Sequence, residues 1–167
     1  MAIDLRFGKE FWMAASLGLV DGVYKASFYG RNTSVGNVEE TIMDISELAG
    51  QRYPFQTAPE NYSISSSDAG DTQQVRIEYL DDNYIFRRII ANLNGQNEVQ
   101  LGISGMRVLD ITNDDATPTA GNVYVFKSLS TLTGGVPDSA TAIRAKFTAA
   151  AQQSNMAIST VPAGFSM

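Results

Sequence analysis

The sequence predicts an all-β protein, in which an extended, aromatic-rich N-terminal arm precedes an antiparallel β-sandwich or barrel of jelly-roll-like type. Two observations predict this fold. From residue 62 onward, short runs of alternating apolar and polar residues recur about every ten positions with turn residues between them, as in antiparallel sandwiches and barrels. Residues 1–60, in contrast, follow no single period. We therefore divide the chain into an arm over residues 1–60 and an antiparallel β domain over residues 61–167.

The clearest strand of the β domain is predicted over residues 74–79. Side chains along a strand point alternately to its two faces, and here one face is apolar and the other charged. The apolar face carries Val75, Ile77 and Tyr79, and the charged face carries Arg76 and Glu78. A turn at Asp81-Asp82-Asn83 follows, because Asp and Asn side chains bond to their own nearby backbone.

Two adjacent arginines, Arg87 and Arg88, interrupt the next predicted strand, over residues 84–93. They break the strict alternation of a run that is rich in aromatic and β-branched residues. A bulge or a strand edge would explain them structurally. A functional interpretation is that they bind a carboxylate on a partner. We favour the structural interpretation and keep both among the candidate interface residues.

The remaining strands are predicted from turns and short apolar runs. Asn94-Gly95 is a strong hairpin signal, since both residues readily take positive φ, and we expect it to join two paired strands of a meander. Residues 123–126 form a compact run that could be buried on both faces. Residues 128–139 form a loop of unusual length, of a kind that tends to contact partners. In residues 142–151 helix and strand both fit, and we favour a strand entering a short helical turn.

The arm is rich in large apolar side chains that follow no regular pattern, with one short helix conceivable over residues 39–48. It could cover an open end of the β domain, or it could dock on another subunit. Each such side chain removed from water contributes about 1.5–3 kcal/mol, so a few of them would offset the ordering of an extended segment. The candidate interface residues of the arm are Phe11, Trp12, Leu17, Tyr24, Phe28, Tyr29 and Arg31.

Composition argues against several classes of partner. The chain has 167 residues, 44% of them hydrophobic, which is enough for one sizeable core. Its net charge of −6 is the wrong sign for binding nucleic acid or an anionic membrane. No apolar run approaches the roughly 20 residues that span a bilayer, and no signal-like segment opens the chain, so we expect synthesis and retention in a cytoplasm.

The composition also argues against catalysis. With no Cys and no His, the chain lacks thiolate nucleophiles, most zinc sites and every Ser-His mechanism. Carboxylate pairs occur at Glu39-Glu40, Asp81-Asp82 and Asp114-Asp115, but the last two stand where turns are expected. Neither a calcium-loop pattern nor a nucleotide-binding pattern is present. We expect no enzyme activity, no metal and no cofactor.

From about Phe28 onward, the order of turns and strands resembles a group of virion structural proteins of tailed bacteriophages and prophages. The residues that carry the resemblance are Phe28-Tyr29-Gly30-Arg31-Asn32, Val38-Glu39-Glu40-Thr41, Tyr53-Pro54, residues 62–67, Asp71-Thr72, residues 75–84, Leu93-Asn94-Gly95, Met106-Arg107, Gly121-Asn122-Val123, residues 152–158 and Val161-Pro162-Ala163-Gly164. The resemblance implies a particle-building protein and brings no catalytic residues with it. Members generally continue beyond the Val-Pro-Ala-Gly turn, so we expect this chain to be a shortened form or a fragment. Oligomerisation or arm exchange would then cover the open sheet edge.

The function that we expect is therefore structural, in a virion assembled in the host cytoplasm. A capsid decoration or cement protein would bind the major capsid protein and other virion proteins, as a homo-oligomer and in particular a trimer. A tail, neck or baseplate component is the alternative. A third possibility is a glycan-binding module, although the aromatic residues are spread out along the sequence and do not cluster.

Overall fold

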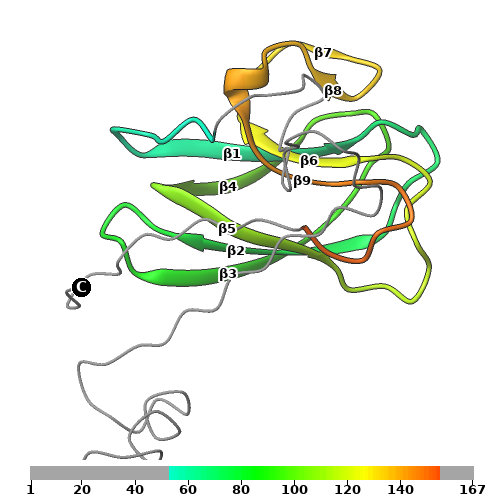
Figure 1. Cartoon of the computed structure of the whole chain (residues 1–167), viewed down its shortest axis with the longest axis horizontal. Coiled ribbons are helices and arrows are strands. Elements are labelled where there is room, and N and C mark those ends of the chain that lie inside the picture. The colour runs from blue at the N-terminus through cyan, green and yellow to red at the C-terminus, as the bar shows by residue number, and fades with distance from the viewer. Residues whose placement is uncertain (1–52, 155–167) are drawn as a thin grey trace, which may run out of the picture.

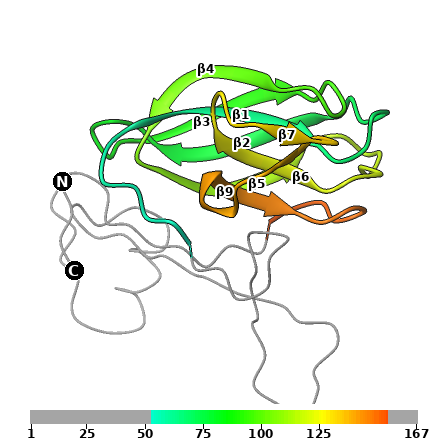
Figure 2. The same ribbon diagram turned by 90° about the horizontal axis from the view of Figure 1, so that it is seen from above.

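Two antiparallel sheets stack face to face in residues 53–154, the part of the chain that the computed structural model describes (Figure 1). Sheet A has the strand order β4-β1-β6-β9 and sheet B the order β3-β2-β5. Figure 2 views the sandwich from above, with β4 and β9 at opposite borders of sheet A. The prediction of an all-β antiparallel fold is confirmed, whereas the arm over residues 1–52 lies outside the described residues. The elements are β1 (Glu60–Ser66), β2 (Gln74–Leu80), β3 (Phe86–Asn92), β4 (Val99–Gly105), β5 (Arg107–Asn113), β6 (Val123–Lys127), β7 (Leu132–Thr133), β8 (Val136–Pro137), a 3-10 turn η1 (Ala140–Ala142) and β9 (Ile143–Phe147).

The main core lies between the two sheets, where alternate residues of each strand point inward. In β2 the inward side chains are Val75, Ile77 and Tyr79, as predicted. Sheet A contributes to the same cluster Tyr62, Ile64, Val123, Val125, Ala145 and Phe147.

The strand β6 is buried on both faces, as the run 123–126 predicts. Tyr124 and Phe126 point away from the main core and form a second apolar cluster with Ile143, against which Leu132 and Val136 pack. The last two residues belong to the β7–β8 hairpin, so residues 128–139, predicted as a partner-binding loop, fold back over the outer face of sheet A.

The Asn94-Gly95 turn joins the two sheets, so the prediction of a hairpin there is wrong. Its flanking strands are not paired, since β3 pairs with β2 and β4 pairs with β1. The turn is held by long-range contacts, in which Gly95 N donates to Asp71 O (2.8 Å) and Ser66 N donates to Gly95 O (2.9 Å). A Cβ on Gly95 would lie 2.3 Å from Ala69 O, so this position needs glycine for close approach as well as for its φ of 56°.

The last described residues cross from sheet A to sheet B. The strand favoured within residues 142–151 is confirmed as β9, and a turn follows it in which Ala151 N donates to Thr148 O (3.0 Å); the 3-10 turn η1 precedes the strand. Beyond β9, residues 152–154 pair with β5, since Asn113 N donates to Gln152 O (2.8 Å) and Ser154 N donates to Ile111 O (2.8 Å). This short segment covers the free edge of β5.

Candidate protein-interaction surface

The arginines singled out in the sequence, Arg87 and Arg88, lie on β3, the outermost strand of sheet B. The pairing of β3 with β2 runs without a register shift, so the strand-edge interpretation is confirmed and the bulge interpretation is wrong. The other candidate interface residues lie outside the described part of the chain: Phe11, Trp12, Leu17, Tyr24, Phe28, Tyr29 and Arg31.

The turn between β2 and β3 is organised by one carboxylate, that of Asp81. Its Oδ1 accepts from the backbone N–H groups of Asn83 (2.9 Å) and Ile85 (3.0 Å), and its Oδ2 accepts from Arg87 Nε (2.9 Å). These bonds, above all that from Ile85 N, hold the pKa of Asp81 below its usual value of 3.8. Tyr84 closes the turn at a φ of 59°, which is unusual for a residue other than glycine. The acidic turn predicted here is confirmed.

Backbone groups of β3 point out from the open edge of the sheet. Two hydrogen bonds flank β3: Asp81 N donates to Ile85 O (2.9 Å), and Leu93 N donates to Gln73 O (3.0 Å). The odd-numbered residues on either side of β3 therefore point their backbone groups toward the chain of β2. In an antiparallel pair, successive residues point their N–H and C=O groups to opposite sides of the strand. The N–H and C=O groups of Phe86, Arg88 and Ile90 therefore point away from β2, toward no other strand of the described sheet.

The other sheet edges are interrupted, whereas β3 is regular. Relative to its neighbour, β4 has extra residues around Gly102, which has a φ of 65°, and β9 has an extra residue at Arg144. The strand β5 has an extra residue at Leu109, and residues 152–154 cover its edge. Bulges are a common means of preventing edge-to-edge association. Among the strands of residues 53–154, β3 is thus the edge best suited to accept another strand.

Large apolar side chains are concentrated on the same strand. Of the five large hydrophobic residues that are exposed in residues 53–154, three belong to β3 or the residue before it, namely Ile85 (45%), Phe86 (48%) and Ile90 (49%). Phe86 and Ile90 share the outer face of sheet B with Arg88, because β-strand side chains alternate. An apolar group of this kind beside an open edge marks a surface for association with another protein.

Ion pairs cover the rest of the outer face of sheet B. Arg88 Nη2 lies 2.7 Å from Glu78 Oε1, and Arg76 Nη1 lies 2.8 Å from Asp114 Oδ1. Asp110, the register partner of Glu78, accepts hydrogen bonds from Thr112 (3.1 Å), Gln153 (2.9 Å) and Ser154. These pairs are partly exposed and contribute little to stability, about 0–1 kcal/mol each. They leave Phe86 and Ile90 as the apolar part of the surface.

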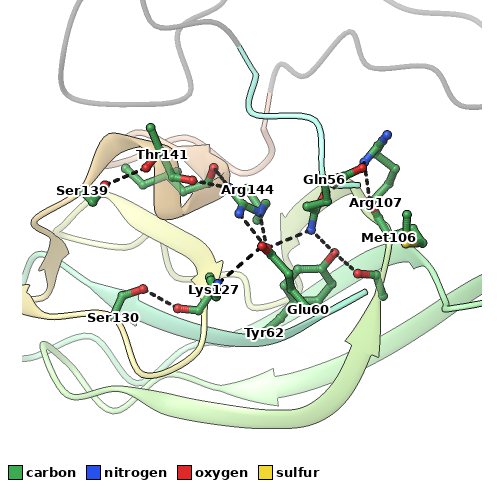
Figure 3. A network of polar contacts seen from close by, with 12 residues as sticks. Gln56, Glu60, Tyr62, Met106, Arg107, Lys127, Ser130, Ser139, Thr141 and Arg144 are labelled. Atoms are coloured by element: carbon green, nitrogen blue, oxygen red, sulfur yellow. Dashed lines mark hydrogen bonds and ion pairs between the residues drawn. The ribbon is translucent and has the colours of Figure 1, made fainter. Parts of the chain in front are cut away.

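A second group of polar side chains lies at the end of the sandwich where the described chain begins (Figure 3). Arg144 donates to Glu60 Oε2 from Nε (3.0 Å) and Nη2 (2.6 Å), and Arg107 Nη1 donates to Gln56 O (3.1 Å). Tyr62 Oη donates to Gly105 O (2.7 Å), and its burial raises the pKa of that hydroxyl well above 10. This group joins β1, β5 and β9 to residues 53–56, which makes its role structural.

Sequence reasoning missed this buried group, because Arg107 and Arg144 carry no local signal that distinguishes them from surface arginines. The flanking residues of Arg144, which are Ile143 and Ala145, were the one available hint of burial. In residues 53–154, no three His, Cys, Asp or Glu side chains gather where they could hold a metal ion, and no helix could span a membrane. The chain matches no protein-family model, no curated protein and no solved structure.

Proposed function

We propose that this chain is a structural protein, not an enzyme, and that it binds other proteins through the β3 edge of sheet B. The observation that carries the proposal is the coincidence of three features on one strand. The strand β3 has a regular open edge, outward backbone groups at Phe86, Arg88 and Ile90, and exposed apolar side chains.

The energetics of strand addition favour this use of the edge. An added strand would bond to the outward N–H and C=O groups of Phe86, Arg88 and Ile90, and each hydrogen bond contributes about 0.5–1.5 kcal/mol net. Phe86 and Ile90 would lose exposed area at the same time, which adds about 25 cal/mol for each Å² of apolar surface buried. Backbone bonds supply affinity, and the side chains supply selectivity.

The setting that we propose is the particle of a tailed bacteriophage, with the chain as a capsid decoration or cement protein. The sequence resemblance supports this setting, and the net charge of −6 suits an exterior position away from packaged DNA. The partners would be the major capsid protein and further copies of this chain, in a homo-oligomer such as a trimer. The chain would enter the virion during assembly in the host cytoplasm.

The first experiment measures copy number and position in purified particles, by quantitative mass spectrometry together with electron microscopy. Hundreds of copies over the shell would support a decoration protein. Tens of copies at one vertex would instead indicate a tail, neck or baseplate component. Absence from particles would contradict the virion proposal and favour the third candidate, a glycan-binding module.

The second experiment tests the β3 edge itself with the variant Ile90→Pro. The N–H of Ile90 points away from β2, so proline there removes an edge donor and keeps the β2–β3 ladder. We expect Ile90→Pro to fold and to lose association with its partner. The matched variant Ile89→Pro removes an N–H that bonds to β2, and it should destabilise the domain itself. A well-folded Ile90→Pro protein that associates normally would contradict the proposed interface.

A further inference from the structure

We propose that residues 37–42 of a neighbouring copy bind β3 as an antiparallel strand and complete sheet B. The inference rests on the proposed function, in which β3 joins subunits, and it names the segment that occupies the edge. Sheet B would then have four strands, the number that sheet A already has.

Charge complementarity identifies the segment. Arg87-Arg88 is the single pair of adjacent basic residues in the sequence, and Glu39-Glu40 is the single pair of adjacent acidic residues outside residues 53–154. An antiparallel register that places Glu39 opposite Arg88 also places Glu40 opposite Arg87. Opposite charges facing each other across two strands stabilise the pairing, by about 0.2–1 kcal/mol for each pair.

The two guanidinium groups have capacity for these carboxylates. Each side chain is 54% exposed although it already pairs within the chain, Arg87 with Asp81 and Arg88 with Glu78. Arg87 donates to its carboxylate from Nε, and Arg88 donates from Nε and Nη2. A guanidinium carries five N–H donors, so each has donors left for a second carboxylate.

The remaining positions of this register are compatible with a strand. Ile89 faces Val38, Ile85 faces Ile42, and Phe86 faces Thr41, so apolar and β-branched side chains meet. The outward backbone groups of Phe86, Arg88 and Ile90 would bond to Thr41, Glu39 and Asn37.

Neighbouring registers are less favourable. If the segment is shifted so that Glu40 faces Arg88, Glu39 faces the apolar Ile89 and Arg87 loses its acidic partner. Moving it the other way sets Arg88 opposite Val38 and leaves only one of the two charge pairs. The register that pairs both arginines with both glutamates is therefore the one that we assign.

Chain length allows the segment to come from another subunit. Residues 43–52 connect it to Tyr53, where the described chain begins, and they extend to about 33–36 Å at most. The same strand supplied by its own chain would fill the edge and leave β3 unable to join subunits. We therefore assign the strand to a neighbouring copy. The helix conceivable over residues 39–48 would then be confined to the residues after 42.

A charge exchange between two copies tests the assignment. In the arm variant Glu39→Arg, Glu40→Arg, the new arginines of one copy would face Arg88 and Arg87 of the next copy. In the acceptor variant Arg87→Glu, Arg88→Glu, the new glutamates would face Glu40 and Glu39 of the next copy. We expect each variant alone to associate at least about 10-fold more weakly than the unmodified chain in analytical ultracentrifugation. In an equimolar mixture, the arm of each variant can meet an acceptor of opposite charge on the other variant, so association between the two variants should return, at two of the three contacts in the case of a trimer. Weak association that mixing does not restore would overturn the proposal.

A disulfide provides a second test that is independent of charge, because the sequence contains no Cys. Copies with Ile42→Cys are mixed with copies with Ile85→Cys, which form a directly opposed pair in the assigned register. Oxidation should give a covalent dimer on a non-reducing gel, and the control Ile45→Cys should give much less. If the mixture gives no covalent dimer, whereas a single chain that carries both Ile42→Cys and Ile85→Cys forms an internal disulfide, the strand belongs to its own chain and the assignment is wrong.

The two proposals fail in different ways. If Ile90→Pro has no effect on association, β3 is not the interface, and the proposed function fails. If Ile90→Pro abolishes association while Glu39→Arg, Glu40→Arg leaves it intact, β3 is the interface and residues 37–42 are not its occupant.

Discussion

Arg144 on β9 donates two hydrogen bonds to one carboxylate oxygen of Glu60 on β1, at 2.6 and 3.0 Å. The strand β6 lies between these two strands, so the ion pair joins next-but-one neighbours in sheet A. The side chain of Arg144 is only 5% exposed, and that of Glu60 is 19% exposed. A guanidinium at such a depth requires its carboxylate, because an unpaired buried charge is strongly unfavourable.

Removing this arginine should destabilise the domain far more than removing an exposed one. We expect Arg144→Ala to lower the free energy of unfolding by about 3–5 kcal/mol, since it leaves Glu60 without its main partner. The control Arg88→Ala breaks an ion pair with Glu78 at a half-exposed position and should cost about 0–1 kcal/mol. Urea denaturation measures both. Equal effects of the two substitutions would show that burial of Arg144 is unimportant for stability.

The turn of the β7–β8 hairpin should tolerate no side chain at Gly135. This residue has a φ of 78°, and a Cβ there would lie 1.8 Å from Ser66 O. Gly135→Ala should therefore cost about 3 kcal/mol or more and lift the hairpin from Tyr124 and Phe126. Gly102 has a φ of 65° but open space around it. The control Gly102→Ala should therefore lower the free energy of unfolding only by the cost of a positive φ in alanine, about 1–2 kcal/mol. Thermal unfolding and near-UV circular dichroism distinguish these outcomes.

The contribution of Asp110 to stability should fall as pH rises, because its pKa is higher in the folded chain than in the unfolded one. Burial raises the pKa of Asp110, and the nearby Glu78 raises it further, although hydrogen bonds from Ser154, Gln153 and Thr112 oppose the shift. The folded pKa of Asp110 exceeds the unfolded value of 3.8, so the protonated carboxyl group stabilises the folded chain. This stabilisation is complete below pH 3.8 and is lost as pH rises through the folded pKa.

The variant Asp110→Asn tests this pH dependence, since its amide does not ionise. We expect the slope of unfolding free energy against pH, above pH 3.8, to be more positive in the variant than in the unmodified chain, because the variant has no Asp110 proton to lose. The variant should also be less stable at low pH, because the amide cannot reproduce all three side-chain hydrogen bonds. Urea denaturation at several pH values gives both quantities. An unchanged slope would mean that another group dominates in this range.

Local patterns predicted the strands well because alternation is a property of a few consecutive residues. Val75, Ile77 and Tyr79 face the core as their spacing requires, and Arg87 and Arg88 mark an edge strand. Pairing partners are not local. The strands on either side of Asn94-Gly95 bond to different sheets, because contacts of that turn with Asp71 and Ser66 outweigh its hairpin preference.

The candidate surface was predictable in part. The two arginines pointed to the β3 edge, whereas the exposure of Phe86 and Ile90 depends on which strand lies beyond β3, and the sequence pattern does not contain that information. The buried arginines depend likewise on three-dimensional neighbours, since Glu60 is far from Arg144 in the chain. Bulges escaped prediction for the same reason, because each is defined by register with a partner strand.

A comparison of two isoleucines on neighbouring strands separates the core from the interaction surface. Ile77 on β2 is fully buried, and we expect Ile77→Ala to cost about 2–5 kcal/mol of stability. Ile90 on β3 is 49% exposed and points to the outer face, so Ile90→Ala should cost less than about 1 kcal/mol while it weakens association. Urea denaturation measures the first effect and analytical ultracentrifugation the second. If Ile90→Ala unfolded as readily as Ile77→Ala, Ile90 would belong to the core, and the apolar part of the β3 surface would have to be Ile85 and Phe86 alone.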